Sequence, residues 1–187
     1  MKMEQAAALE AGLANTTRLV QGIGEDQWEN STPCAKWNVR ELVQHTVGVM
    51  ANFAAGAANE PIPGDPMAYD LGSDPGAACA SVAADCVANW KARGELESMV
   101  TLGDNEFPGM VGININLLDA YVHGWDIAQA TGQNAELDEG LSAALHGFSQ
   151  QAIPPAPREG DNFWAVVDAG DGASSAAQML GYLGRNP

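Results

Sequence analysis

The sequence predicts an all-α protein: a bundle of long helices, followed by shorter helices and interrupted by one short hairpin. Several long segments carry apolar residues at the 3.6-residue spacing of amphipathic helices, and only one segment is typical of a pair of strands. The chain has 187 residues and no internal repeat. This length is typical of one domain, so we expect a single helical domain over residues 1–187.

The first two helices are predicted from their periodicity and from the residues at their ends. Residues 4–20 carry leucine and other apolar side chains at helical spacing, and two glycines follow them. After a loop, Asn38 occupies the position of an N-cap, and Glu41 three residues later completes a capping box. The second helix should therefore begin after Asn38 and end near Asn59.

The middle of the chain contains strong helix breakers. Residues 60–72 are rich in proline and glycine, which do not sustain regular structure, so we expect a long connection. Pro75 suits the first turn of a third helix, which should run to Gly94. Residues 98–108 have Gly, Asp and Asn at their centre and predict a short hairpin or an irregular arm.

The fourth helix is predicted over residues 110–131 and should end at Gly132. It is apolar on most of its circumference, which indicates a position inside the protein. Weaker helical patterns cover residues 138–151 and 173–183, and a proline-rich segment at 154–157 separates them.

The composition argues against several classes of partner. Asp and Glu number 24 against 8 Lys and Arg, which gives a formal net charge of −16. Such a surface repels phosphate backbones and anionic lipid headgroups, so we expect neither a nucleic-acid nor a membrane partner. No apolar run approaches the roughly 20 residues that span a bilayer, and the first residues do not resemble a secretory leader. We therefore expect a cytoplasmic protein.

The three cysteines, Cys34, Cys79 and Cys86, are odd in number and form no CxxC pair. Cys79 and Cys86 lie seven residues apart on one predicted helix, about 10 Å from each other, which is too far for a disulfide. We expect reduced thiols with a mainly structural role.

The fourth helix carries one stripe of polar residues. Asn116, Asp119, His123 and Asp126 recur at intervals of three, four and three, which places them on one face. Burying a carboxylate and an imidazole is costly unless they are paired, and a divalent cation pairs with both. The i, i+4 spacing of Asp119 and His123 is the one by which a helix offers two ligands to one metal. The stripe predicts a metal site.

His45 is the favoured third ligand. It lies on the polar flank of the second helix, and Gly48, one turn further on, should leave room for the metal. His146 lies in a weaker helix and is expected at the surface or partly packed. Other polar residues are expected to support the ligands rather than to bind the metal: Asp126, Asn116 and Glu41. An alternative remains open, in which Asp119 and His123 form only a hydrogen-bonded pair and His45 is solvated.

The motifs TPCAKWNV at residues 32–39 and VHGWDIA at 122–128, with the ending LGRNP at 183–187, resemble the actinobacterial DinB-like family. More narrowly, they resemble the metal-binding domain of mycothiol-dependent maleylpyruvate isomerase and its single-domain relatives. The resemblance implies a DinB/YfiT-like four-helix bundle that binds zinc or another divalent ion through one His and a Glu-x-x-x-His pair. On this chain those ligands are His45, Asp119 and His123, with Asp119 where Glu is usual.

The resemblance also implies a function. We expect a metal-dependent thiol transferase or isomerase-like enzyme, with mycothiol as cosubstrate, a small electrophile as substrate and a metal-bound thiolate or water as nucleophile. Zinc is favoured, and nickel, iron and cobalt also suit these ligands. The isomerase itself has a further C-terminal domain at its substrate site, so isomerisation of maleylpyruvate is not expected. The alternative is a non-catalytic metal- or ligand-binding bundle, serving as a sensor or a dimeric scaffold. A non-haem iron oxygenase shares the ligand count and is less favoured, and a homodimer is compatible with the apolar helix faces.

Overall fold

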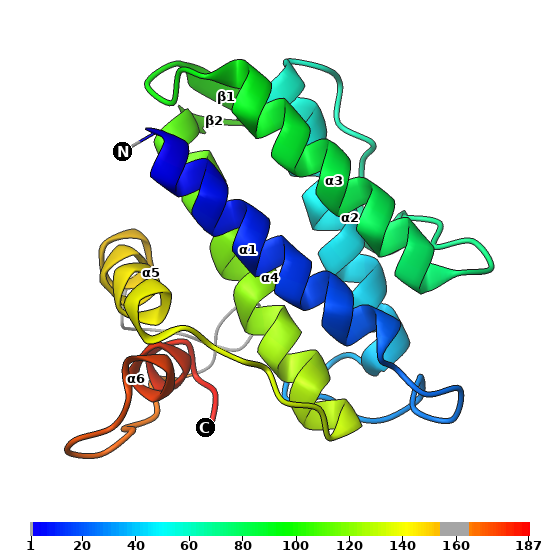
Figure 1. Ribbon diagram of the computed structural model, residues 1–187, viewed down its shortest axis with the longest axis vertical. Helices are drawn as coiled ribbons and strands as arrows, with labels where there is room; N and C mark the ends of the chain where they lie inside the picture. The colour runs from blue at the N-terminus through cyan, green and yellow to red at the C-terminus, as the bar shows by residue number, and fades with distance from the viewer. Residues whose placement is uncertain (1, 154–164) are drawn as a thin grey trace. The chain divides into compact units, whose positions relative to one another are not determined.

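The computed structural model describes residues 2–153 and 165–187. In this part of the chain it contains six α-helices, one short 3-10 helix and one two-stranded antiparallel sheet, which confirms the predicted mostly-α fold (Figure 1). The chain forms two compact units, Met1–Ala135 and Glu136–Pro187. The expectation of a single domain over residues 1–187 stays a prediction, and the proline-rich segment at 154–157 lies outside the described residues.

The first unit contains a bundle of four helices: α1 (Lys2–Gln21), α2 (Val39–Ala58), α3 (Pro75–Arg93) and α4 (Gly109–Thr131). Helix α1 packs against α3 and α4, and α2 packs against the same two helices. In Figure 1, α1 and α4 run in one direction and α2 and α3 run in the other. Helices α2 and α4 are thus antiparallel neighbours, and the connection from α2 to α3 runs the length of the bundle.

The start of α2 is fixed by the predicted capping box and by the loop before it. The side chain of Asn38 accepts a hydrogen bond from the backbone N–H of Glu41, and the Glu41 carboxylate accepts one from the backbone N–H of Asn38. The hydroxyl of Thr32 donates to the carbonyl oxygens of Cys34 and Trp37 at 3.0 and 2.8 Å. These bonds hold the loop over residues 31–38 against the helix that follows it.

Polar contacts set the register between α1 and α4. The buried hydroxyl of Thr16 donates to the carbonyl oxygen of Ala120 at 2.8 Å. Gly124 permits this approach, because a Cβ atom there would lie 3.0 Å from the Thr16 hydroxyl oxygen. Just beyond the C-terminal end of α4, the side chain of Gln133 donates to the carbonyl oxygen of Leu19 at 2.9 Å. Helix α1 therefore fixes the turn of α4 that carries Ala120.

The long connection after α2 contains the 3-10 helix η1 (Pro66–Ala68), which packs on Gly48 of α2. A Cβ atom at Gly48 would lie 2.4 Å from the carbonyl oxygen of Pro66. We expected Gly48 to leave room for a metal, and this was wrong: the missing side chain makes room for the backbone of η1. Asn52 fastens the same connection by donating to the carbonyl oxygen of Gly64 at 2.7 Å.

Helix α3 begins with Asp74 as its N-cap, and its last residue, Arg93, donates to carbonyl oxygens at the end of α2. The predicted hairpin is present as strands β1 (Met99–Leu102) and β2 (Asn105–Pro108), and β2 leads directly into α4.

The second unit contains α5 (Glu139–Ala152) and α6 (Ser175–Tyr182), which pack against each other. Their bounds lie close to the predicted ranges. His146 on α5 is partly buried, with its ring 5.6 Å from that of Tyr182. This agrees with the expected partly packed position of His146.

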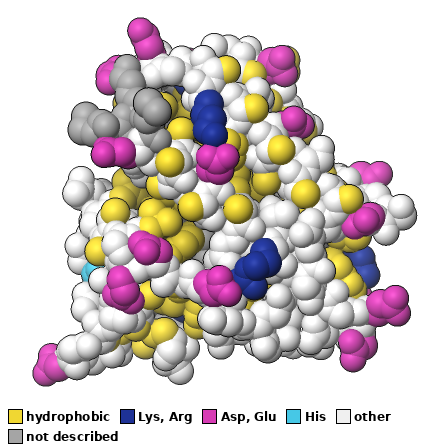
Figure 2. Space-filling view, viewed as in Figure 1, with side chains coloured by type: hydrophobic (Ala, Val, Ile, Leu, Met, Phe, Trp, Pro, Cys, Tyr) yellow, Lys and Arg dark blue, Asp and Glu magenta, His cyan; other side chains and the backbone are white. Residues whose placement is uncertain are grey.

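Acidic side chains are scattered over the face of the molecule drawn in Figure 2, with few Lys or Arg among them. Several basic side chains are engaged within the fold: Lys91 pairs with Glu10 at 2.8 Å, and Arg40 lies 3.6 Å from Glu29. Among the described residues, no helix is both long and apolar enough to cross a membrane.

Candidate metal centre

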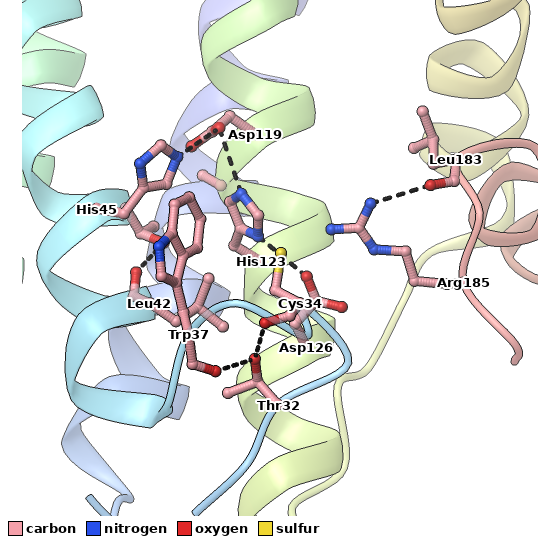
Figure 3. A network of polar contacts seen from close by, with 12 residues as sticks. Thr32, Cys34, Trp37, Leu42, His45, Asp119, His123, Asp126, Leu183 and Arg185 are labelled. Carbon is pink, nitrogen blue, oxygen red and sulfur yellow. Dashed lines mark hydrogen bonds and ion pairs between the residues drawn. The ribbon is translucent and has the colours of Figure 1, made fainter. Parts of the chain in front are cut away.

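Three side chains from the antiparallel helices α2 and α4 point toward one place (Figure 3). The Nε2 atom of His45 on α2 lies 3.5 Å from Oδ1 of Asp119 on α4. The Nε2 atom of His123, one turn further along α4, lies 3.6 Å from the same oxygen. One ligand atom from each residue lies within 4.8 Å of the other two. The structure thus brings together the three residues that the sequence predicted as ligands.

The separations suit a small divalent cation. Donors about 2.1 Å from a tetrahedral zinc ion lie about 3.4 Å from one another, and the two separations here are 3.5 and 3.6 Å. Although Asp119 is shorter than Glu, a single oxygen of its carboxylate reaches both imidazoles. The side chain of His45 is only 19% exposed, which does not fit the alternative of a solvated histidine. Two imidazoles and one carboxylate also suit nickel, iron and cobalt.

Asp126 holds the opposite edge of the His123 ring. Its Oδ2 atom lies 3.0 Å from Nδ1 of His123, and the residue is fully buried. A carboxylate in this position fixes the tautomer and the orientation of a metal-binding imidazole, because Nδ1 carries the proton and Nε2 is left to face the metal. The sequence predicted a supporting role for Asp126 but not this partner.

The other two expected supporting residues make different contacts. Glu41 takes part in the capping box at the start of α2. The side-chain nitrogen of Asn116 lies 2.9 Å from the sulfur of Cys86 on α3, in the core of the bundle. Helical spacing placed Asn116 on the same face of α4 as Asp119 and His123. In the structure its side chain contacts Cys86 of α3 instead of the candidate ligands.

The charges around His123 favour a positive group. Burial by itself would lower the pKa of the imidazole, because it penalises the charged ring. The negative charge of Asp119 outweighs burial, together with hydrogen bonds to Asp126 and Cys34, and raises the pKa from 6.5 to about 10. Two carboxylates therefore stabilise positive charge at this ring, and a divalent cation is one way to supply it.

Trp37 covers the two imidazoles. Its ring centroid lies 4.4 Å from that of His45 and 6.1 Å from that of His123. The two imidazole planes are nearly perpendicular, at 89°. The aromatic side chain restricts the rotation of both rings and limits the access of water to them.

The contact of Cys34 with His123 was not predicted from the sequence. None of the three cysteines forms a disulfide, as expected. Cys79 and Cys86 are buried in the bundle, whereas Cys34 is half-buried in the loop before α2. The thiol of Cys34 makes a hydrogen bond with His123, and Figure 3 shows it beside His123 and Asp126. The signal available in the sequence was the position of Cys34 three residues before Trp37, in the motif that precedes α2.

Comparison with known proteins bears on this centre. The sequence model of a family described as "Mycothiol maleylpyruvate isomerase N-terminal domain" matches residues 9–128, which include all three candidate ligands. Two similar relatives are the uncharacterized proteins MT0763 and Rv0738 of Mycobacterium tuberculosis, strains CDC 1551 / Oshkosh and ATCC 25618 / H37Rv. Each is 30% identical over 170 residues, covering 89% of this chain and 90% of the relative. No solved structure matches the chain significantly.

Proposed function

The chain belongs to the mycothiol maleylpyruvate isomerase N-terminal domain family, and on this basis we propose that it is a divalent-metal-dependent thiol transferase. Its proposed substrates are a low-molecular-weight thiol, by the family's name mycothiol, and a small electrophile. The observation that supports the proposal is the convergence of His45, Asp119 and His123 at separations suited to one cation.

Three protein ligands are the number found in catalytic zinc sites, which keep one position for water or substrate. His45, Asp119 and His123 would hold the divalent cation, which would lower the pKa of a bound thiol well below its ordinary value of about 8.5. Asp119 would contribute one negative charge and the two imidazoles would bind as neutral groups. Such a ligand set would keep a net positive charge, which favours an anionic sulfur over a neutral one.

Other residues of the chain have supporting roles in the proposal. Asp126 accepts the Nδ1 proton of His123 in a hydrogen bond and makes the opposite nitrogen a better ligand. The ring of Trp37 lies against His45 and would keep bulk water from one side of the centre. A drier site strengthens the attraction between the positive centre and an anionic sulfur.

A thiol-addition assay tests the proposal. The purified protein is loaded with zinc, nickel, cobalt or iron and incubated with mycothiol and a panel of electrophiles, and thioether formation is followed by mass spectrometry. We expect catalysis that requires one bound divalent ion and that is lost in His45→Ala and His123→Ala. His146→Ala is the matched control, because His146 lies on α5 against Tyr182, and it should retain the activity.

Two other outcomes contradict parts of the proposal. If the protein retains no divalent ion, the metal centre itself is wrong. If it retains a stoichiometric ion but accelerates no thiol addition and gains no thermal stability from mycothiol, the function is that of a non-catalytic metal-binding bundle.

A further inference from the structure

The Nδ1 edge of His123 faces a second set of metal-ligating side chains. Cys34, His123 and Asp126 each offer an atom within 4.8 Å of those of the other two. Their donors differ from those of the first centre, because a sulfur replaces one imidazole. The two sets share only the ring of His123, with Nε2 facing Asp119 and Nδ1 facing Asp126 at 3.0 Å.

We propose that Cys34, the Nδ1 atom of His123 and Asp126 form a second cation site, selective for a thiophilic divalent ion such as zinc or cadmium. The ring of His123 would then bridge two cations. The second cation displaces two protons to solvent, one from the Cys34 thiol and one from Nδ1 of His123. No function of the second ion in thiol transfer is needed for this proposal.

The donor chemistry selects the class of cation. Thiolate sulfur is a soft ligand that binds zinc and cadmium and disfavours magnesium and calcium, and a mixed sulfur, nitrogen and oxygen set is typical of zinc. Asp126 is fully buried and Cys34 is half-buried, so the oxygen comes from the protein interior and the sulfur from the side that solvent reaches. A cation would therefore enter from the side of the loop.

The charges of the two sites balance. With both sites filled, Asp119, Asp126, the Cys34 thiolate and the His123 imidazolate carry four negative charges, and two divalent cations carry four positive ones. This balance matters because an unpaired charge at a buried site is costly. Without the four negative charges, a second divalent cation would be repelled by the first.

The loop before α2 holds Cys34 in position for binding. The carbonyl oxygen of Cys34 accepts hydrogen bonds from the Thr32 hydroxyl at 3.0 Å and from the backbone N–H of Trp37 at 2.9 Å. The backbone of Cys34 is thus restrained, and the cation would have to order only its side chain. A ligand on a restrained backbone loses less conformational entropy on binding.

Cobalt titration tests the proposal on the full chain, because a cobalt–thiolate bond gives a charge-transfer band in the near ultraviolet. We expect two equivalents of cobalt to bind and the thiolate band to develop with one of them. Cys34→Ser should abolish the band and reduce the stoichiometry to one. Cys79→Ser is the matched control, since Cys79 is buried in α3, and it should leave the band unchanged. His45→Ala damages the first centre alone, so it should lower the stoichiometry while the thiolate band remains.

X-ray absorption spectroscopy of the cadmium-loaded, unmutated protein is a second test. It does not depend on whether the variants fold. We expect a sulfur neighbour for one of the two cadmium ions. Binding that stops at one equivalent, spectra without a sulfur ligand, or a thiolate band that survives in folded Cys34→Ser would overturn the second site. None of these results would remove the first centre, whose loss is measured separately in His45→Ala.

Discussion

The indole of Trp37 stacks on the imidazole of His45, with ring centroids 4.4 Å apart and planes inclined by 31°. Trp37 comes from the loop before α2 and His45 from the helix itself, so the contact connects the loop to a candidate metal ligand.

Truncation of this aromatic contact should weaken metal binding. In Trp37→Ala the His45 ring gains rotational freedom and exposure to water, and we expect an affinity lower by about tenfold, as for other groups that orient a ligand. Trp37→Phe keeps an aromatic face and should stay within about threefold of the unmutated protein. Competition with a chromogenic chelator measures both affinities, and equal affinities for the Ala variant and the unmutated protein would contradict this role.

Asp126→Asn should lower metal affinity by about 10- to 100-fold, the range for groups that hold a metal-binding histidine. The amide is nearly isosteric with the carboxylate but is a weaker acceptor for the Nδ1 proton of His123. Asp85→Asn makes the same charge change on the exposed surface of α3 and should leave the affinity unchanged. A comparable loss in both variants would mean that net charge, rather than the contact with His123, determines the affinity.

Two glycine substitutions should change stability in opposite directions. Gly48→Ala places a methyl group 2.4 Å from the carbonyl oxygen of Pro66, and we expect a loss of about 1–3 kcal/mol in the free energy of unfolding. Gly147→Ala adds a methyl group with no neighbour within 4 Å in the helical interior of α5, and it should stabilise by about 0.5–1 kcal/mol. Urea denaturation followed by circular dichroism measures both. A neutral Gly48→Ala would show that η1 moves away freely.

Much of the fold could be predicted from the sequence because the signals are local. Caps and breakers mark the ends of α2 and α3, and periodicity marks α4. The i, i+4 spacing of Asp119 and His123, and the i, i+3 spacing of His123 and Asp126, place these side chains on one helix face before any tertiary contact is known. In those cases one helix carries all the information that is needed.

Contacts between elements were harder to predict. The sequence of α2 alone suggested that Gly48 leaves room for a metal. The tertiary structure shows that the backbone at Pro66 fills this space. Cys34 meets His123 across 89 residues of sequence, and no spacing rule connects a loop to a helix over that distance. For the same reason the contact of Asn116 with Cys86 was not foreseen.

In the metal-free folded protein, the three thiols should differ in reactivity. Burial raises the pKa of the Cys79 thiol, and it raises that of Cys86 from 9.0 to about 12 against the opposing hydrogen bonds. Both are therefore poor nucleophiles, because the thiolate is the reactive form. Iodoacetamide at neutral pH should label Cys34 first, and the other two only after unfolding, as read by peptide mass spectrometry. Equal labelling of Cys86 in folded protein would show that the bundle opens readily.

The raised pKa of Cys86 also predicts a pH dependence of stability. A thiol whose pKa is higher in the folded state than in the unfolded state stabilises the fold below its unfolded pKa. This contribution is lost as the pH rises from about 9 toward the folded value of about 12. The free energy of unfolding should fall over this range, and Cys86→Ala should show a shallower decline. Identical slopes for the two proteins would contradict the prediction.

The hydroxyl of Thr16 and the carbonyl oxygen of Ala120 meet beside Asp119. No part of α1 supplies one of the three candidate ligand atoms, yet the bond from Thr16 anchors α4 at the residue next to Asp119. An engineer who transplanted only α2 and α4 into another scaffold would keep the candidate ligands and lose this anchor.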